Sequence, residues 1–226
     1  MGEMVDFPSN GGNASGYLAT PDGGGGIPLV VIQEWWGLVP HIKDVCDRFA
    51  AEGFAALAPD LYHGQTTTEP DEAGKLMMAL NMQQAAKDLS GAVSKLQDVT
   101  GKFHVGVTGF CMGGGLALVL ATQRPDAVAA AVPWYGLPAW PDAAPDWSAL
   151  TASILGHYAA NDGFFGPAPV AQLQETLDSL GKDAELRVHP DVDHAFFNDT
   201  RPEVYDKAAA DACFAETVAF LKANLP

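Results

Sequence analysis

Apolar runs of strand length alternate with segments of helical periodicity along almost all of this 226-residue chain. Runs with the continuous apolar character that burial on both faces of a sheet requires occur at 28–33, 54–59, 104–108, 128–135, 153–157 and 184–189. Apolar residues recur at helical spacing in 42–50, 82–99, 170–180 and 208–225. This alternation predicts an α/β fold with a mostly parallel, doubly wound sheet and helices on both faces.

Length and composition favour a single domain over residues 1–226. With 48% hydrophobic residues, a chain of this length can bury about three quarters of its unfolded surface. These values exclude a disordered chain, a fibrous protein and a small disulfide-stapled scaffold. The four glycines at 23–26 predict a turn, and the Pro/Ala/Trp-rich stretch 137–147 predicts an irregular loop. Neither stretch indicates a second domain.

The charge and the cysteine content restrict the partners and the compartment. A formal net charge of −16 argues against nucleic acid or an anionic membrane surface as partner, because both are negatively charged. No targeting segment is visible at the amino terminus, and no apolar run approaches the roughly 20 residues that span a bilayer. Three scattered cysteines are typical of a reducing compartment. We therefore expect a cytoplasmic protein; its oligomeric state is not fixed by the sequence, although a monomer is favoured.

The segment 105–120 contains the strongest signal for chemistry. An apolar strand ends at GFCMG, residues 109–113, and a helix begins at once. This is the pattern of a nucleophile elbow with cysteine in place of serine, and the helix amino terminus below the sulfur favours the thiolate. We therefore predict Cys111 to be a nucleophile. Cys46 and Cys213 lie on apolar helical stripes and are predicted to be inert buried thiols.

Two further strand ends carry the groups that a thiol nucleophile needs. Asp162 follows one apolar run and His194 follows the next, so the order Cys111, Asp162, His194 is that of an α/β-hydrolase triad. His157 and His189 are competitors, but both fall within strand-like runs, where their rings would point into packing. The six histidines show no metal-binding spacing. The sequence therefore indicates neither a metal nor a cofactor.

The end of the first apolar strand supplies further candidates. QEWWG at 33–37 lies where this arrangement places a second backbone donor to an oxyanion. The N–H groups of Trp35 and Met112 are therefore the predicted oxyanion hole. Glu34 would lie close to the core, where an unpaired carboxylate costs on the order of several kcal/mol. It is interpreted either as a chemical group beside the thiol or as a buried acid satisfied by the backbone.

With these residues, the chain resembles the dienelactone hydrolase (carboxymethylenebutenolidase) family, cysteine-dependent α/β-hydrolases that open enol lactones. The resemblance covers nearly the whole chain and rests on QEWWG at 33–37, PDLY at 59–62, GFCMGG at 109–114, Asp162 and DHAF at 193–196. It implies a single-domain α/β-hydrolase with Cys111 as nucleophile, His194 as base and Asp162 as its orienter. It further implies that Glu34 contacts the resting thiol and accepts its proton as substrate arrives. The reaction would proceed through a thioester without a cofactor.

The chain departs from the family in its arginines. The best-known lactone-opening members bind the substrate carboxylate with two arginines. Four residues after His194, where one would lie, this chain has Asn198, and no arginine occurs between positions 48 and 124, where the other would lie. Neither Lys75 nor Arg201 occupies a matching place. An anionic substrate is therefore not expected to be anchored as in those relatives.

Aromatic residues near strand ends predict an apolar mouth to the site. The predicted substrate-binding residues are Trp36, Trp134, Phe196 and Asn198. Together with the net charge of −16, they favour small neutral esters or lactones over carboxylated dienelactones. Two other classes remain as alternatives: a thiol redox protein that uses Cys111, and a non-catalytic binding module on a hydrolase scaffold.

Overall fold

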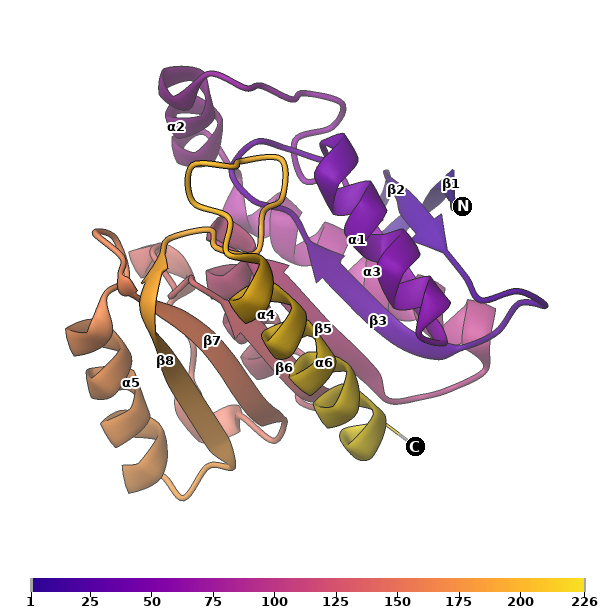
Figure 1. Cartoon of the computed structure of the whole chain (residues 1–226). Helices are drawn as coiled ribbons and strands as arrows, with labels where there is room; N and C mark the ends of the chain where they lie inside the picture. The colour runs from indigo at the N-terminus through magenta and orange to yellow at the C-terminus, as the bar shows by residue number, and fades with distance from the viewer. Residues whose placement is uncertain (1, 226) are drawn as a thin grey trace.

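The computed structural model describes residues 2–225, which form one eight-stranded sheet with the order β1-β2-β4-β3-β5-β6-β7-β8 (Figure 1). The strands are β1 (Glu3–Ser9), β2 (Gly12–Ala19), β3 (Ile27–Ile32), β4 (Phe54–Pro59), β5 (Val105–Phe110), β6 (Val128–Trp134), β7 (Ser153–Asn161) and β8 (Ala184–Asp193). The helices are α1 (Pro40–Ala51), α2 (Pro70–Met78), α3 (Met82–Thr100), α4 (Met112–Gln123), α5 (Pro167–Ser179) and α6 (Lys207–Asn224), with short 3₁₀ turns η1 (Pro141–Ala143) and η2 (Trp147–Ala149).

The strands from β3 to β8 pair in parallel, and β2 pairs antiparallel with both β1 and β4. The apolar runs of the sequence correspond to β3 to β8, which confirms the predicted mostly parallel sheet. The β1–β2 hairpin at the sheet edge was not predicted. Its strands are half exposed and lack the continuous apolar runs of the buried strands. The signal lay in the turn, because Asn10 and Gly11 both have positive φ, as an Asn-Gly hairpin turn requires.

Helices cover both faces of the sheet, as predicted. The side chains of α1 and α6 pack on one face, which is turned toward the viewer in Figure 1. Those of α3, α4 and α5 pack on the other. The helix starts have recognisable causes: α1, α2 and α5 have proline in the first turn, whereas Asn81 and Asp206 cap α3 and α6 with their side chains. Helix α2, which the sequence analysis did not predict, projects beyond the body of the sheet.

The carboxyl ends of the parallel strands bring the predicted chemistry to one edge. Glu34 follows β3, Cys111 follows β5, Asp162 follows β7 and His194 follows β8, each within two residues of the strand end. The last two strands end level with each other, since Asn161 is opposite Asp193 in the register. Because parallel strands end at the same side of a sheet, these four side chains meet above it.

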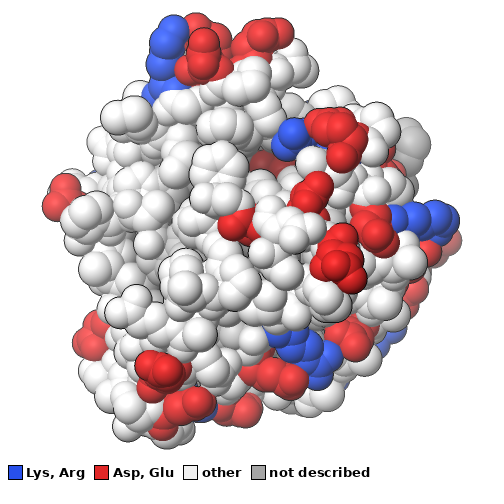
Figure 2. Space-filling view, turned by 60° about the vertical axis from the view of Figure 1, so that its left-hand side comes forward, with Lys and Arg blue, Asp and Glu red and all other residues white. Residues whose placement is uncertain are grey.

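The described residues contain no helix that is long and apolar enough to cross a membrane. Acidic side chains outnumber basic ones on the face shown in Figure 2, in line with the net charge of −16. A broad area to the left of centre in that view carries few charges.

Candidate active site

Cys111 lies at the sharp turn between β5 and α4. Its backbone adopts φ 53° and ψ −115°, which is strained for a residue with a side chain. Its N–H donates to the carbonyl oxygen of Trp134 at 3.0 Å and so fixes the turn against β6. A Cβ at Gly109 would collide with the Gly113 carbonyl, and a Cβ at Gly113 would collide with the carbonyl oxygens at the end of β3. The two glycines therefore allow the close approach that presents Cys111 above the sheet.

His194 and Asp162 form a hydrogen-bonded pair beside this turn. His194 Nδ1 lies 2.7 Å from Asp162 Oδ2. The other carboxylate oxygen, Oδ1, accepts from the backbone N–H groups of Phe164 at 2.7 Å and Phe165 at 2.9 Å. Burial raises the pKa of Asp162, but the bonds from His194 and from these N–H groups outweigh it, so the pKa lies below its usual range. Asp162 is thus held as a carboxylate that fixes the His194 ring.

The pKa of His194 is raised to about 10. Burial disfavours the imidazolium, yet the hydrogen bonds and charges of Asp162 and Cys111 favour it more strongly. These two partners place the imidazole between the carboxylate of Asp162 and the sulfur of Cys111. Tyr135, whose φ is 34°, packs edge-on against the His194 ring with the centroids 5.2 Å apart. The environment of His194 therefore stabilises the charge that it acquires on accepting a proton.

Glu34 is 1% exposed and belongs to the same site. Its Oε2 accepts from the side-chain amide of Asn198 at 2.8 Å, whereas its Oε1 has no hydrogen-bond partner among the described residues. The interpretation of Glu34 as an acid satisfied by the backbone is therefore wrong; its partner is a side chain. Burial, together with Glu34 and Cys111, raises the pKa of the Tyr135 phenol well above its usual value. The Tyr135 hydroxyl and the Cys111 thiol are therefore the neighbouring groups from which Glu34 can accept a further hydrogen bond.

A pocket of about 460 Å³ opens above these residues. It is lined by Glu34, Trp35, Trp36, Pro70, Met77, Cys111, Phe164, Phe165, His194, Ala195 and Arg201. Most of these side chains are apolar, and α2 contributes Pro70 and Met77 to the wall. The guanidinium of Arg201 lies 2.8 Å from a Glu203 oxygen and 5.9 Å from the centre of the Trp36 ring. The positive charge in the pocket is thus already paired.

The two predicted oxyanion donors lie at the turns that follow β3 and β5. Met112 is the first residue of α4, so its N–H belongs to the free first turn of the helix. Trp35 follows Glu34 and lines the pocket. Among residues 2–225, neither N–H takes part in a backbone hydrogen bond of a turn, loop or helix cap. Both positions are compatible with donation to a bound oxygen.

The predicted substrate-binding residues are only partly brought to the pocket. Trp36 lines it, but Trp134 and Phe196 are fully buried, with their ring centres 5.9 Å apart. That part of the prediction is wrong. Strand β6 directs Trp134 into the layer between the sheet and α6, where its ring packs at a tilt against His157 with the ring centres 4.6 Å apart. Asn198 donates a hydrogen bond to Glu34. Its side chain lines a neighbouring cavity of about 470 Å³ and not the pocket that contains Cys111.

Several residues of the site were missed by the sequence analysis. Phe164 and Phe165 act through backbone N–H groups, and Tyr135 depends on an unusual backbone conformation. None of these features has a signature in composition or periodicity. Arg201 was considered but not placed; its contribution to the pocket wall depends on the path of the chain between β8 and α6.

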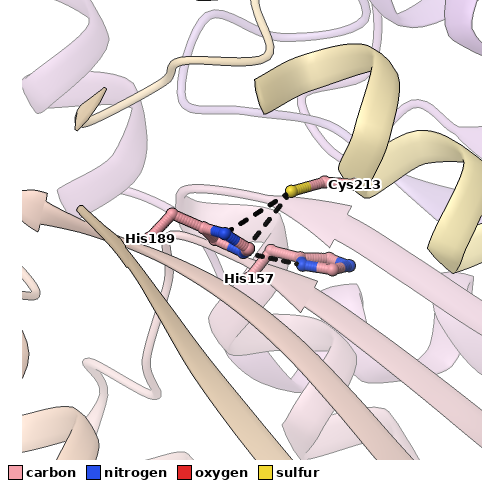
Figure 3. Close-up of side chains that lie close together, drawn as sticks. All are labelled: His157, His189 and Cys213. Carbon is pink, nitrogen blue, oxygen red and sulfur yellow. Dashed lines mark hydrogen bonds between the residues drawn. The ribbon is translucent and has the colours of Figure 1, made fainter. Parts of the chain in front are cut away.

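A second cysteine–histidine cluster lies away from the pocket, between the sheet and α6 (Figure 3). It consists of His157 on β7, His189 on β8 and Cys213 on α6. As predicted, Cys213 is buried and both histidines lie within strands. Burial and neighbouring positive groups lower the pKa of His157 to about 3, and burial raises the pKa of Cys213 to about 12. Sequence spacing did not show that the three side chains meet.

The order of the sheet and the elbow between β5 and α4 define an α/β-hydrolase. The family model of the dienelactone hydrolase family matches residues 14–225. The chain belongs to this family, which confirms both the predicted fold class and the predicted resemblance.

Individual relatives agree with this assignment. "Protein usf" from Aquifex pyrophilus is 40% identical over the full length of both chains. A protein from Aquifex aeolicus that is provisionally named a carboxymethylenebutenolidase is 37% identical, again over both full lengths. A crystal structure from Klebsiella pneumoniae, provisionally described as a dienelactone hydrolase, has a TM-score of 0.89 and 30% identity and covers 98% of each chain.

Proposed function

We propose that this protein hydrolyses small esters or lactones, with Cys111 as nucleophile, His194 as base and Asp162 as the group that orients His194. The observation that carries the proposal is the elbow: Cys111 shares one pocket with His194, and His194 is hydrogen-bonded to Asp162 at 2.7 Å. Nucleophile, base and orienting carboxylate are the groups that acyl transfer requires.

In the acylation step, Cys111 loses its proton to a neighbouring base, and the sulfur attacks the carbonyl carbon. A C–S bond forms while the π electrons of the carbonyl move to its oxygen, and the N–H groups of Met112 and Trp35 donate to that oxygen. As the intermediate collapses, the C–O bond breaks. The leaving oxygen departs as an enolate or takes a proton from the His194 imidazolium, and a thioester remains.

In the deacylation step, His194 acts as a base toward water. Acylation removes the negative sulfur, one of the groups that raise the pKa of His194. The imidazole therefore gives up its proton more readily once the thioester has formed. It can then accept a proton from water as the oxygen attacks the thioester carbon. The C–S bond breaks and the acid is released. The thiolate then takes back the proton that the base accepted during acylation, so the resting thiol is restored without a cofactor.

Glu34 is assigned the role of protecting the resting thiol. Its Oε1 lacks a partner among the described residues, while Asn198 holds the other oxygen and lines the opposite side of the carboxylate. A carboxylate held this way can accept the Cys111 proton when substrate enters. Because the thiolate then forms only with substrate present, the sulfur is less exposed to oxidation.

The pocket favours a neutral substrate. Its wall is mainly aromatic and apolar, Glu34 is acidic, and Arg201 is paired with Glu203 and packed on Trp36. An anionic group would have to compete with Glu203 for the guanidinium. All the groups that the proposal uses come from one chain, and the three cysteines are free. The reaction therefore needs no residue from a second chain, and we propose a reducing compartment, the cytoplasm, as its location.

Trapping of the acyl-enzyme tests the nucleophile. The protein is mixed with an aryl acetate, quenched in acid within the first turnover and digested, and the peptides are analysed by mass spectrometry. We expect one acetyl group, labile to hydroxylamine, on the peptide that contains Cys111. A binding module would give no product, and a thiol redox protein would consume peroxide without forming this adduct. An acetyl group on another residue would refute the assignment.

A side-by-side kinetic comparison tests the substrate class. We expect neutral aryl esters or uncharged lactones to exceed carboxylated dienelactones by at least about tenfold in kcat/KM, at low and at high salt. Arg201→Gln provides the control, because it removes the one guanidinium of the pocket wall. A dienelactone preference in the native protein that is lost in Arg201→Gln would show that Arg201 anchors the carboxylate and would refute the preference for neutral substrates.

A further inference from the structure

We propose that His157, His189 and Cys213 form a binding site for a divalent transition-metal ion, with Zn²⁺ as the ion that fits best. The three side chains come from β7, β8 and α6, and one ligand atom of each lies within 4.8 Å of the others (Figure 3). The site is separate from the pocket that contains Cys111 and His194, none of whose wall residues belongs to it.

Two of the three distances between the ligand atoms are close to those of a tetrahedral site, and the third lies within 4.8 Å. His157 Nδ1 lies 3.0 Å from His189 Nε2, and Cys213 Sγ lies 3.4 Å from the same nitrogen. Zinc bound at about 2.0–2.1 Å from nitrogen and about 2.3 Å from sulfur has ligand-to-ligand edges of roughly 3.3–3.6 Å. An outward movement of a few tenths of an ångström therefore opens enough room for the ion.

A second contact orients the His157 ring for this role. Its Nε2 lies 3.2 Å from the hydroxyl of Thr217, which is one helical turn beyond Cys213 on α6. Donation from Nε2–H to this hydroxyl leaves Nδ1 as the lone-pair nitrogen, facing His189. A ligand histidine that donates its other N–H to a fixed acceptor is the common arrangement at metal sites. Thr217 is fully buried, so the acceptor cannot be replaced by bulk water.

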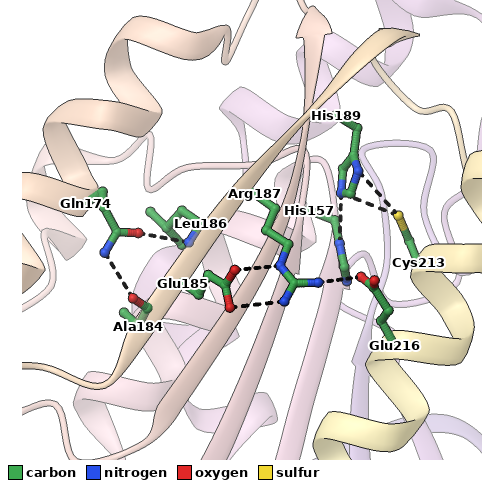
Figure 4. A network of polar contacts seen from close by, with 9 residues as sticks. All are labelled: His157, Gln174, Ala184, Glu185, Leu186, Arg187, His189, Cys213 and Glu216. Carbon is green, nitrogen blue, oxygen red and sulfur yellow. Dashed lines mark hydrogen bonds and ion pairs between the residues drawn. The ribbon is translucent and has the colours of Figure 1, made fainter.

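The charged residues around the cluster also accommodate a cation. Glu216 follows Cys213 by three residues on α6 and accepts from Arg187, which is also bonded to Glu185 (Figure 4). The positive guanidinium is thus matched by two carboxylates, and this group of charges sums to −1. Glu216 is exposed and His189 is half-buried, so the site can be reached from solvent on this side.

The donor set selects the class of ion. Two imidazole nitrogens and one thiolate form a borderline-soft set that suits zinc, whereas Mg²⁺ and Ca²⁺ require oxygen ligands. When the ion binds, Cys213 releases its proton to solvent, because the thiolate is the ligand. The bound ion would join α6 to β7 and β8, five residues before Asp162 and His194 respectively. A water molecule or the Glu216 carboxylate would complete the tetrahedron.

The test uses Co²⁺ as a spectroscopic probe, followed by displacement with Zn²⁺. It is carried out on the full chain with Cys111→Ala, so that any thiolate signal comes from a cysteine other than the nucleophile. This background keeps the result independent of the proposed hydrolysis. We expect one Co²⁺ per chain, a sulfur-to-cobalt charge-transfer band, the visible bands of tetrahedral cobalt, and loss of all of them on addition of Zn²⁺.

Two variants locate the site and one is a control. Cys213→Ser should remove the charge-transfer band, and His189→Gln should weaken Co²⁺ binding by at least about tenfold. His189 is half-buried, so His189→Gln tests the proposal even where loss of the Cys213 thiol disturbs folding, which circular dichroism monitors. Cys46→Ala, which removes a buried thiol on α1, should leave the band and the affinity unchanged.

Three results would overturn the proposal. The first is an octahedral cobalt spectrum without a thiolate band, which indicates adventitious binding to surface carboxylates. The second is a band that persists in a folded Cys213→Ser protein. The third is an equal Co²⁺ affinity in the Cys111→Ala chain with and without His189→Gln. As an independent measurement, Zn²⁺ should raise the Tm of the Cys111→Ala chain by several degrees. The Tm of the same chain with His189→Gln should stay nearly unchanged.

Discussion

Cys111 and Cys213 each have histidine neighbours, but the surroundings of these two cysteine–histidine pairs differ. Cys111 lies at a strained turn beside a pocket, and a buried carboxylate holds His194 at the distance of a hydrogen bond. Cys213 lies on the buried side of α6, and its histidine neighbours have no carboxylate within hydrogen-bond distance among the described residues. The pKa of His194 is raised, whereas those of the histidines near Cys213 are lowered.

The difference shows that the surroundings decide what a cysteine–histidine pair can do. A carboxylate stabilises an imidazolium and so makes its histidine a proton acceptor. Burial without a carboxylate keeps the imidazole neutral, and a neutral imidazole has the lone pair that a metal ion binds. Access to a pocket is the remaining condition for a nucleophile, and Cys111 lines such a pocket.

The largest effect is expected from Cys111→Ala, which removes the proposed nucleophile from the first pair. Turnover of an aryl acetate should fall by at least about a thousandfold, because nothing else in the pocket can form the acyl-enzyme. The fold should survive, since the turn depends on Gly109 and Gly113. Cys46→Ala is the matched control, with an expected change of less than about twofold. Activity above a few per cent in purified Cys111→Ala would contradict the assignment.

Asp162→Asn makes the first pair resemble the second by removing its carboxylate. We expect kcat to fall by about 10²–10⁴-fold and the pKa of His194 to fall from about 10. The raised pKa makes His194 an imidazolium at neutral pH. The contribution of this charge to the stability of the folded protein is fully present below about pH 6.5 and is lost as the pH rises through about 10. NMR titration of the imidazole checks this. An unchanged titration in Asp162→Asn would mean that the carboxylate does not control the histidine.

The smallest effect concerns the glutamate near each cysteine–histidine pair. Glu34 is buried near the Cys111 pair, and Glu216 is exposed near the Cys213 cluster. Glu34→Gln removes a negative charge beside Cys111, so the thiolate should form more readily. We expect alkylation by iodoacetamide at pH 7 to become more than about twofold faster. Glu216→Gln should leave this rate unchanged. An identical pH profile of alkylation in Glu34→Gln would give Glu34 a purely structural role.

The fold and the central residues of the site could be predicted because both have local signatures. Continuous apolar runs marked the strands from β3 to β8, and the glycines around Cys111 marked a turn that few other sequences make. The position of Asp162 and His194 just after strands placed them at one edge of a parallel sheet. These features depend only on residues adjacent in the sequence and on the rule that parallel strands end at the same edge of a sheet.

The rest of the site could not be predicted, because it depends on which way a side chain points between elements. Trp134 and Phe196 look like pocket residues by position, yet both point into the layer beneath α6. His157, His189 and Cys213 come from elements that lie far apart in the sequence and meet only because β7, β8 and α6 pack together. Such contacts leave no periodicity or spacing that a single sequence can show.

The level ends of β7 and β8 have a consequence for how this protein can diversify. Asp162 and His194 follow directly after two paired strands that end level, with Asn161 opposite Asp193 after an irregularity in the ladder. The separation of acid and base is therefore inherited from the sheet and does not depend on the lengths of the segments at 163–166 and 195–206. Insertions or exchanges there can reshape the aromatic and arginine wall of the pocket. New substrate preferences can thus arise by loop evolution while the proton-transfer geometry stays constant.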